Sequence, residues 1–356
     1  MAPLAPLFEF QMHPTRDSLE APLGKNSFAL EALAARCDDG SAYGWALRTI
    51  RGKERQLYIP KRELDPVQRR INQVLYPIDL SFGTAPHGFI ARRSILSNAR
   101  PHCGANYLHK FDIKDFFSNV TTQHAEAALS LLGFGKQAAS LLARLTSCRG
   151  ALPLGARTSP RISNMVLLGF DEEMEDLARD KGLTYTRYAD DLSFSSASDF
   201  EIGDFVEEAL RIRGFVLNST KTKSFKRGQP MFVTGLSVAD SKYPRLRKRL
   251  KTRLRQEFYF IEKYGLDEHC NFIEEPRLIA ASRLSGQYHY ALTVEPDFAA
   301  DLAGQFPNAR AAVAPQHDDS RAERAQRHRR EFVAKVLKAP GRSLPFYQPF
   351  VPLVSQ

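Results

Sequence analysis

Two adjacent aspartates, Asp190 and Asp191, interrupt a run over residues 183–194 that is otherwise apolar or typical of strands. Adjacent carboxylates are costly to place near a sheet unless something compensates them. Neighbouring side chains on a regular strand point to opposite faces, so both carboxylates reach one site only if the chain turns at Asp190-Asp191. We therefore expect a β-hairpin with its turn there. A surface turn that uses Asp-Asp for its turn preference is the alternative.

A third aspartate, Asp112, lies near the end of a strand that we expect over residues 107–113. If this strand end lies beside the hairpin turn, three carboxylates surround a divalent cation. Mg²⁺ suits such hard oxygen ligands and completes its octahedron with water and phosphate oxygens. Two such ions are the general solution for in-line phosphoryl transfer. The residues alone leave the metal site and the surface turn open.

The composition is that of a folded chain with a polyanionic partner. The 356 residues are 43% hydrophobic and carry a net charge of +10. Four cysteines without a C-x-x-C pair indicate neither a zinc knuckle nor a disulfide framework. The chain has no run of eighteen apolar residues and no basic residue before its short apolar N-terminal stretch. We therefore expect a cytoplasmic protein without a membrane partner.

The positive charge is concentrated in residues 242–255, which include eight basic residues and no acidic one. Apolar residues at steps of four and three predict a helix with one stripe on the core and a cationic outer face. The stripe consists of Leu246, Leu250, Leu254, Phe258 and Ile261. Contact with a phosphate backbone explains this block better than a solvated surface. A second basic cluster, residues 317–330, is mixed with acidic residues and is expected to be a solvated helix.

Three other segments are predicted from their patterns. Ser159 followed by Pro160 opens a helix whose apolar face continues through Leu177 until Gly182. Residues 230–238 are expected to form a strand, and residues 94–109 are expected to be irregular.

Five motifs follow one another, and their common order is the strongest signal in the chain. They are F-D-I-K-D-F-F, L-P-L-G-A-R-T-S-P-R-I-S-N, Y-A-D-D, G-F-V-L-N-S-T-K-T-K and V-T-G-L. The set resembles the successive motifs of a reverse transcriptase palm. The N-A-x-x-H pattern at Asn98 and His102 and the V-T-G pattern over residues 233–235 resemble elements of the bacterial retron branch. The resemblance covers roughly residues 50 to 300.

The resemblance implies an α+β fold, a right-hand polymerase with fingers, a palm of antiparallel sheet backed by helices, and a helical thumb. The expected divisions are an N-terminal extension over 1–50, fingers over 51–111, a palm over 112–239 and a thumb over 240–305. A second fingers segment is interleaved at about 122–158. A C-terminal helix and Pro-rich tail take up 306–356.

The catalytic carboxylates implied by the resemblance are Asp112, Asp190 and Asp191. Together with the backbone carbonyl of Ile113 they would hold two Mg²⁺ ions, for which Mn²⁺ can substitute. Asp115 is expected to have a structural role.

The resemblance assigns contacts with the incoming nucleotide to Lys61, Arg93, Phe117, Gly155 and Lys221. Phe117 falls at the steric-gate position, where a bulky ring beneath the sugar excludes a ribose 2′-hydroxyl. A core aromatic is the alternative for Phe117. Lys61 and Arg93 would grip the triphosphate and stabilise the charge that shifts onto pyrophosphate.

Two further features of these motifs concern the template and the leaving group. Gly155 lets the chain approach the templating pair closely because it has no side chain. Either Lys221 or Lys223 falls in the motif that supplies a proton to the leaving pyrophosphate. The chain departs from the family at Leu154, where glutamine is common, and at Arg157, where proline is frequent. These departures bear on fidelity and processivity more than on activity.

Contacts with RNA and DNA are expected from two sets of residues. The retron-like elements would help to recognise a structured RNA and comprise Asn98, His102, Val233, Thr234 and Gly235. The basic segment would follow the template–primer duplex with Arg245, Arg247, Lys248, Arg249, Lys251 and Arg253.

The function implied is that of a retron-type reverse transcriptase. Such an enzyme copies its cognate structured noncoding RNA into single-stranded DNA from deoxynucleoside triphosphates. Priming from a 2′-hydroxyl would give a branched RNA–DNA product, and an effector protein would act with the enzyme in phage defence. The alternatives are another prokaryotic reverse transcriptase (group II intron, diversity-generating or abortive-infection type) and a catalytically inactive RNA-binding subunit of a defence complex.

Overall fold

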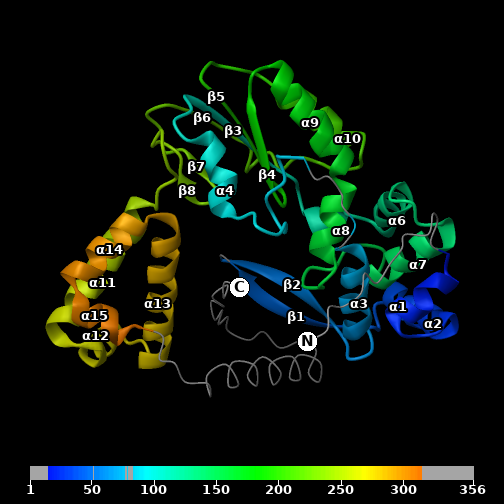
Figure 1. Cartoon of the computed structure of the whole chain (residues 1–356), viewed down its shortest axis with the longest axis horizontal. Coiled ribbons are helices and arrows are strands. Elements are labelled where there is room, and N and C mark those ends of the chain that lie inside the picture. Colours follow the sequence, from blue (N-terminus) through cyan, green and yellow to red (C-terminus); the bar gives the residue numbers. More distant parts are fainter. Residues whose placement is uncertain (1–14, 51, 77, 79–82, 315–356) are drawn as a thin grey trace, which may run out of the picture.

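A four-stranded antiparallel sheet with strand order β4-β5-β3-β6 lies at the centre of the fold. The computed structural model describes residues 15–50, 52–76, 78 and 83–314. The sheet strands are β3 (Tyr107–Asp112), β4 (Thr184–Tyr188), β5 (Asp191–Ser196) and β6 (Lys223–Lys226). Figure 1 places the sheet at the top, with α9 (Leu168–Asp180) and α10 (Gly203–Arg211) beside it.

Strand alternation gives this sheet two different faces. Side chains of one face pack in a core with α9 and α10, among them Phe111, Tyr185, Leu192 and Phe194. Leu108 points to the other face and belongs to a second core. Asp112 lies four residues beyond Leu108 and pairs in register with Asp191 of β5, so both aspartates belong to this second face.

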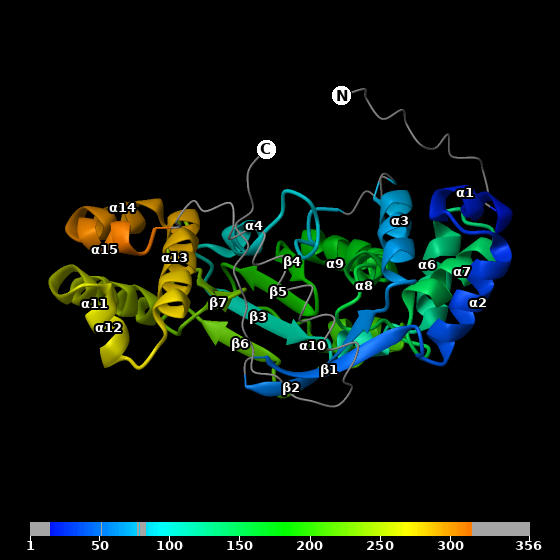
Figure 2. The same cartoon turned by 90° about the horizontal axis from the view of Figure 1, so that it is seen from below.

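The first core continues into the N-terminal part of the chain. It packs helices together and includes Tyr43 and Tyr58 of a two-stranded antiparallel sheet, β1 (Tyr43–Ile50) with β2 (Lys53–Pro60). The helices are η1 (Asp17–Leu19), α1 (Glu20–Leu23), α2 (Ser27–Asp38), α3 (Asp65–Leu75), α5 (Phe116–Asn119), α6 (Thr122–Leu131), α7 (Lys136–Thr146) and α8 (Ser159–Val166). In Figure 2 the helices α1, α2, α6 and α7 form one end of the molecule.

The second core joins the central sheet to the C-terminal helices at the opposite end of Figure 2. Between them lie α4 (Ile95–Ala99), η2 (Arg100–His102) and the hairpin of β7 (Phe232–Val233) with β8 (Leu236–Ser237). The C-terminal helices are α11 (Lys248–Tyr264), α12 (Leu266–Phe272), α13 (Arg277–Val294), α14 (Pro296–Gln305) and α15 (Pro307–Ala312).

Three local predictions need correction. The single helix expected from Ser159 is broken at Leu167, whose backbone (φ −92°, ψ 6°) ends α8 and precedes α9. Leu167 is fully buried, so core packing sets this break. The strand expected over 230–238 is the β7–β8 hairpin, because Thr234 and Gly235 both have positive φ, as the tightest hairpin turns require. The irregular segment over 94–109 contains α4, which Ser94 opens with a capping box.

The basic helix begins later than expected. α11 starts at Lys248, so the basic residues from Lys242 to Arg247 precede the helix, with a bend at Lys242. Within α11 the predicted apolar stripe is buried at Leu254, Phe258 and Ile261, and Leu250 is partly buried. The basic cluster 317–330 and the Pro-rich tail lie outside the described residues. Among the helices of the described part, none has the length and apolar character to cross a membrane.

Candidate active site

The aspartate hairpin forms one residue away from the predicted position. Tyr188 pairs with Asp191, so the turn residues are Ala189 and Asp190, and Asp191 already begins β5. Ala189 adopts φ 57°, in the left-handed region. The turn is fastened to β3, because the Ile113 N–H donates to the Asp190 carbonyl over 3.0 Å.

The three aspartates converge at this end of the sheet. Asp112 and Asp191 face each other across β3 and β5, and Asp112 is almost fully buried. Burial raises the pKa of Asp190 to about 6, with further increases from the negative charges of Asp191 and Asp112. The site thus concentrates like charges that a cation would neutralise.

Asp112 is held by the loop that precedes β6. The Lys221 ammonium contacts Asp112 Oδ1 at 2.5 Å, and the Asn218 side-chain amide donates to Oδ2 at 3.3 Å. The Asn218 N–H also donates to the Asp112 carbonyl at 2.7 Å. Lys223, the other lysine of this motif, is exposed in β6 and pairs with Lys110 in register. Of the two lysines considered from the sequence, the structure therefore brings Lys221 to the aspartates.

The donor chemistry of this site suits a hard divalent cation, because carboxylate oxygens are the ligands that Mg²⁺ takes in proteins. Within the described ranges, however, no three His, Cys, Asp or Glu side chains are placed as a metal ion would hold them. The Lys221 ammonium occupies one Asp112 oxygen in this structure. The residues fit the ion by chemistry, and Lys221 must move for Asp112 to bind one through Oδ1.

The expected nucleotide contacts come from several elements. Phe117 lies in α5 at half-burial, with its ring edge-on to Phe89. The Arg93 guanidinium donates to the carbonyls of Pro86 (2.6 Å) and Gly83 (2.7 Å). Lys61, just after β2, donates to the Ser41 carbonyl at 2.8 Å. Both cations thus stabilise loops through backbone carbonyls in this structure.

The segment around Gly155 packs against β2. The Tyr58 N–H donates to the Leu154 carbonyl at 2.8 Å. A Cβ on Gly155 would lie 2.9 Å from the Tyr58 carbonyl oxygen, and its φ of 110° also requires glycine. Arg157, one of the two departures from the family pattern, forms an ion pair with Asp65 at 2.5 Å. Its side chain is therefore directed to α3.

Asn98 and His102 are buried, which argues against their expected contact with RNA. His102 is fully buried, and its two ring nitrogens bond to the hydroxyls of Ser195 (2.7 Å) and Thr186 (2.8 Å). Burial lowers the pKa of His102 to about 3, so the ring stays neutral. The ring thereby attaches η2 to β4 and β5.

The V-T-G segment adds further contacts to this attachment of α4 and η2 to the central sheet. Val233 is fully buried, and the Thr234 hydroxyl donates to the Ile95 carbonyl of α4 at 3.0 Å. The V-T-G segment therefore contacts α4, which contains Asn98, and Ala99 and Val233 belong to the same core.

Tertiary contacts neutralise part of the basic segment. Glu295, which is buried, bonds to Lys251 at 3.2 Å and to Arg245 at 3.5 Å, and Asp240 also pairs with Arg245. Glu257 forms an ion pair with Arg253 at 2.7 Å.

Other cations of this segment remain at the surface. The Arg247 guanidinium lies over the Phe232 ring at 4.6 Å and donates to the Gly235 carbonyl. Lys248 and Arg249, in the first turn of α11, are exposed and form no ion pair within the described chain. Positive charge is unfavourable at a helix N-terminus, so these two cations do not serve to stabilise the helix.

Comparison with known proteins assigns the family. The model of the family "Reverse transcriptase (RNA-dependent DNA polymerase)" matches residues 46–244, more than half of the chain. The chain belongs to the reverse transcriptase family. The aspartate hairpin and the loop before β6 lie within the matched residues, and the predicted α+β fold with an antiparallel sheet is confirmed.

The curated relatives confirm the predicted likeness to retron reverse transcriptases. The chain is 34% identical to the retron Mx65 reverse transcriptase of Myxococcus xanthus over 268 residues, which are 66% of this chain and 61% of the relative. It is also 34% identical to the retron Ec86 reverse transcriptase of Escherichia coli over 193 residues, 53% of this chain and 59% of the relative. The chain thus spans about three fifths of the length of these relatives.

Solved structures show a weaker likeness. The apo telomerase of Candida Tropicalis aligns with a TM-score of 0.43 and 12% identity, covering 76% of this chain and 61% of that one. The telomerase of Candida albicans in complex with a fragment of telomeric RNA aligns with a TM-score of 0.41 and 12% identity, covering 85% of this chain and 66% of that one.

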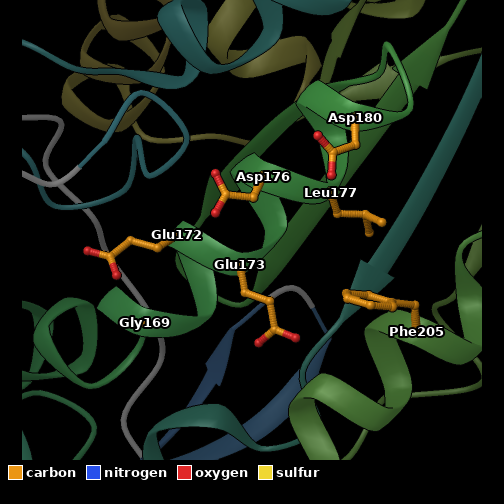
Figure 3. A pocket seen from close by; sticks show the side chains of 7 residues that line it. All are labelled: Gly169, Glu172, Glu173, Asp176, Leu177, Asp180 and Phe205. Atoms are coloured by element: carbon orange, nitrogen blue, oxygen red, sulfur yellow. The ribbon is translucent and has the colours of Figure 1, made fainter.

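A cavity of about 470 Å³ in this reverse transcriptase chain is lined by no residue of the aspartate hairpin. Figure 3 shows it beside α9, with Phe205 of α10 at one side. Four carboxylates line it, those of Glu172, Glu173, Asp176 and Asp180. Because α9 covers the sheet face opposite Asp112 and Asp191, and because the lining is acidic, we do not assign a nucleotide to this cavity.

Two residues that hold the hairpin or Asp112 in place were not singled out from the sequence. Arg187 is fully buried, makes two hydrogen bonds to Asp171 of α9, and donates to the Ala189 carbonyl of the turn at 3.1 Å. An arginine within the strand-forming run of residues 184–188 was the available signal, since a guanidinium that becomes buried in a sheet requires a carboxylate partner. Asn218 is the second such residue and lies within a recognised motif.

Proposed function

We propose that this chain is a retron-type RNA-directed DNA polymerase that copies a cognate structured noncoding RNA into single-stranded DNA. The observation that carries the proposal is the convergence of Asp112, Asp190 and Asp191 at one end of a sheet in a chain of the reverse transcriptase family. Deoxynucleoside triphosphates are the second substrate.

The reaction joins the primer hydroxyl to the α-phosphorus of a nucleotide and releases pyrophosphate. Reverse transcriptases generally use divalent metal ions, which activate the hydroxyl and stabilise charge on the phosphates. Asp112, Asp190 and Asp191, with the Ile113 carbonyl, would hold two Mg²⁺ ions, or Mn²⁺ in their place. Lys221 would leave Asp112 as the ions bind and then protonate the departing pyrophosphate.

The nucleotide would be positioned by residues on either side of the aspartates. Phe117 would exclude a ribose 2′-hydroxyl by its volume. Arg93 and Lys61 would contact the triphosphate after exchanging their backbone carbonyl partners for phosphate oxygens. Gly155, whose backbone packs on β2, would leave room for the templating pair.

The domain division follows from the same proposal. Residues 51–111 and about 122–158 would form the fingers, 112–239 the palm and 240–305 the thumb. The two cores support the separate thumb, because the second core collects the C-terminal helices, whereas the first core is shared by the N-terminal elements and one face of the central sheet. Residues 1–50 would be an N-terminal extension and 306–356 a C-terminal segment.

The template–primer duplex would contact the exposed cations at the start of α11. Arg247, Lys248 and Arg249 are exposed, whereas the acidic partners of Arg245, Lys251 and Arg253 reduce their share in binding. The buried retron-like elements would act by holding α4 and the β7–β8 hairpin in position for the RNA.

The similarity to retron enzymes extends the proposal to the product and its use. We infer that priming occurs from an RNA 2′-hydroxyl, that the product is a branched RNA–DNA, and that the enzyme works with an effector protein in phage defence in the cytoplasm. Four curated relatives at or above 30% identity are retron reverse transcriptases, which supports this extension.

Primer extension on an RNA template tests the polymerase activity. The parent should synthesise DNA in Mg²⁺, Asp190→Ala should not, and the matched control Asp115→Asn should retain synthesis, because Asp115 is exposed. Absence of DNA synthesis by the parent would overturn the proposal. Sequencing of co-purified nucleic acid tests the retron type: branched, RNA-linked single-stranded DNA supports it, and random RNA fragments argue for a general polymerase.

A further inference from the structure

The segment before α4 rests directly on the catalytic hairpin. His87 N–H donates to the Arg187 carbonyl at 2.7 Å, and Arg187 N–H donates to the Ala85 carbonyl at 2.8 Å, so residues 85–87 extend the sheet beside β4. A Cβ on the next residue, Gly88, would lie 2.6 Å from the backbone nitrogen of Ala189 in the hairpin turn. Only glycine permits this close approach.

Buried and charged side chains fix the same segment from behind. The Asn164 side-chain amide of α8 donates to the Gly88 carbonyl at 2.8 Å. The Glu175 carboxylate of α9 accepts from the N–H groups of Thr84 and Ala85, each at 2.6 Å. With the Arg93 contacts described above, these bonds determine the path of the backbone up to Phe89.

Phe89 is held in a conformation that phenylalanine rarely adopts. Its φ is 63°, in the left-handed region, where a bulky side chain is strained. The ring is 39% exposed, so burial does not explain why the strain is retained. A strained residue beside a catalytic turn indicates a functional constraint rather than a packing one.

The Phe89 ring meets Phe117. Their centroids are 6.2 Å apart and the planes are inclined at 64°, an edge-to-face contact. Phe117 also packs at 5.7 Å against Phe116, which is buried. Phe117 therefore contacts one aromatic ring of the core and one that is partly exposed.

We propose that Phe89 is a specificity-determining residue that prevents the Phe117 ring from moving away from the sugar of the incoming nucleotide. A ring rejects a 2′-hydroxyl by volume only if it cannot rotate aside. The proposal rests on the proposed function, in which Phe117 lies beneath that sugar.

Replacement of Phe89 by glycine distinguishes two effects, the loss of the aromatic ring and the relief of the backbone strain. Phe89→Gly should lower the preference for deoxynucleotides over ribonucleotides, measured as the ratio of kcat/KM values, by about two- to tenfold, the range for one aromatic pair. Its thermal midpoint should equal or exceed that of the parent, because glycine adopts positive φ without strain. Phe89→Ala should show the same loss of preference with a lower midpoint than Phe89→Gly.

A matched control is Phe205→Ala, which removes a phenylalanine of similar exposure (43%) on α10. It should leave the sugar preference unchanged. A preference that stays at the parent value in Phe89→Gly, while Phe117→Ala admits ribonucleotides, would overturn the proposal for Phe89. So would a thermal midpoint of Phe89→Gly well below the parent, since it would show a packing role. Failure of the proposed function is distinct: the parent would then make no DNA.

Discussion

Replacing Asp190 by asparagine should stabilise the cation-free protein at neutral pH while abolishing DNA synthesis. Asp190 stands in a partly buried turn, where Asp191 and Asp112 are the facing negative groups and Lys221 is the facing positive one. Its ordinary pKa of 3.8 applies to the unfolded chain, and the folded pKa is about 6. The folded state therefore binds this proton more tightly than the unfolded state.

The sign of the pH dependence follows from that difference. Stability that is present below pH 3.8 is lost as the pH rises through 6, because the folded protein must then carry a third negative charge at the site. The loss amounts to about 3 kcal/mol at pH 7.5 and about 1 kcal/mol at pH 4.5. Asparagine has nearly the same shape and no charge, so Asp190→Asn should gain up to these amounts.

Urea unfolding in EDTA at the two pH values measures the gain. The control Asp115→Asn, an exposed aspartate at positive φ where asparagine is tolerated, should stay within about 0.5 kcal/mol of the parent. Mg²⁺ should stabilise the parent more than Asp190→Asn, because the ion would relieve the same repulsion. An unchanged stability of Asp190→Asn, or an equal gain at both pH values, would refute the reasoning.

Three other variants test separate parts of the proposals. Phe117→Ala should admit ribonucleotides in a single-nucleotide incorporation assay, and unchanged sugar discrimination would remove Phe117 from the gate. His102→Ala should lower the free energy of unfolding in urea by about 2–4 kcal/mol, because it removes the ring that bonds to two hydroxyls in the core. A change below about 0.5 kcal/mol would show that the attachment of η2 to β4 and β5 through His102 is unimportant for stability. The double substitution Lys248→Gln and Arg249→Gln should reduce the slope of log affinity against log salt for a template–primer duplex by about two. Equal slopes for variant and parent would show that Lys248 and Arg249 form a solvated surface and do not contact the duplex.

Local patterns in the sequence determined much of the architecture. The Asp-Asp pair within a strand-forming run predicted the hairpin to within one residue, because strand propensity and turn preference act over neighbouring residues. The apolar stripe of Leu254, Phe258 and Ile261 predicted the buried side of α11 for the same reason. The order of the motifs was sufficient to indicate the family that the comparison then established.

Tertiary structure alone decided which side chains meet. Lys221 and Asp112 are 109 residues apart, and nothing local distinguished Lys221 from Lys223. Glu295 neutralises Lys251 across 44 residues, which a count of charges along the chain could not reveal. His102 resembled a recognition residue in sequence, yet its partner Ser195 lies 93 residues further on and encloses it in the fold.

The physical reason is the range of the forces involved. Backbone conformation and apolar periodicity depend on residues within a few positions, so the sequence displays them directly. Burial and ion pairing depend on distance in space. Residues that are far apart in the sequence become neighbours only when the two cores form on the central sheet. The three aspartates were therefore identifiable from sequence, whereas the lysine that pairs with them, the anchored histidine and the strained Phe89 became visible only in the folded chain.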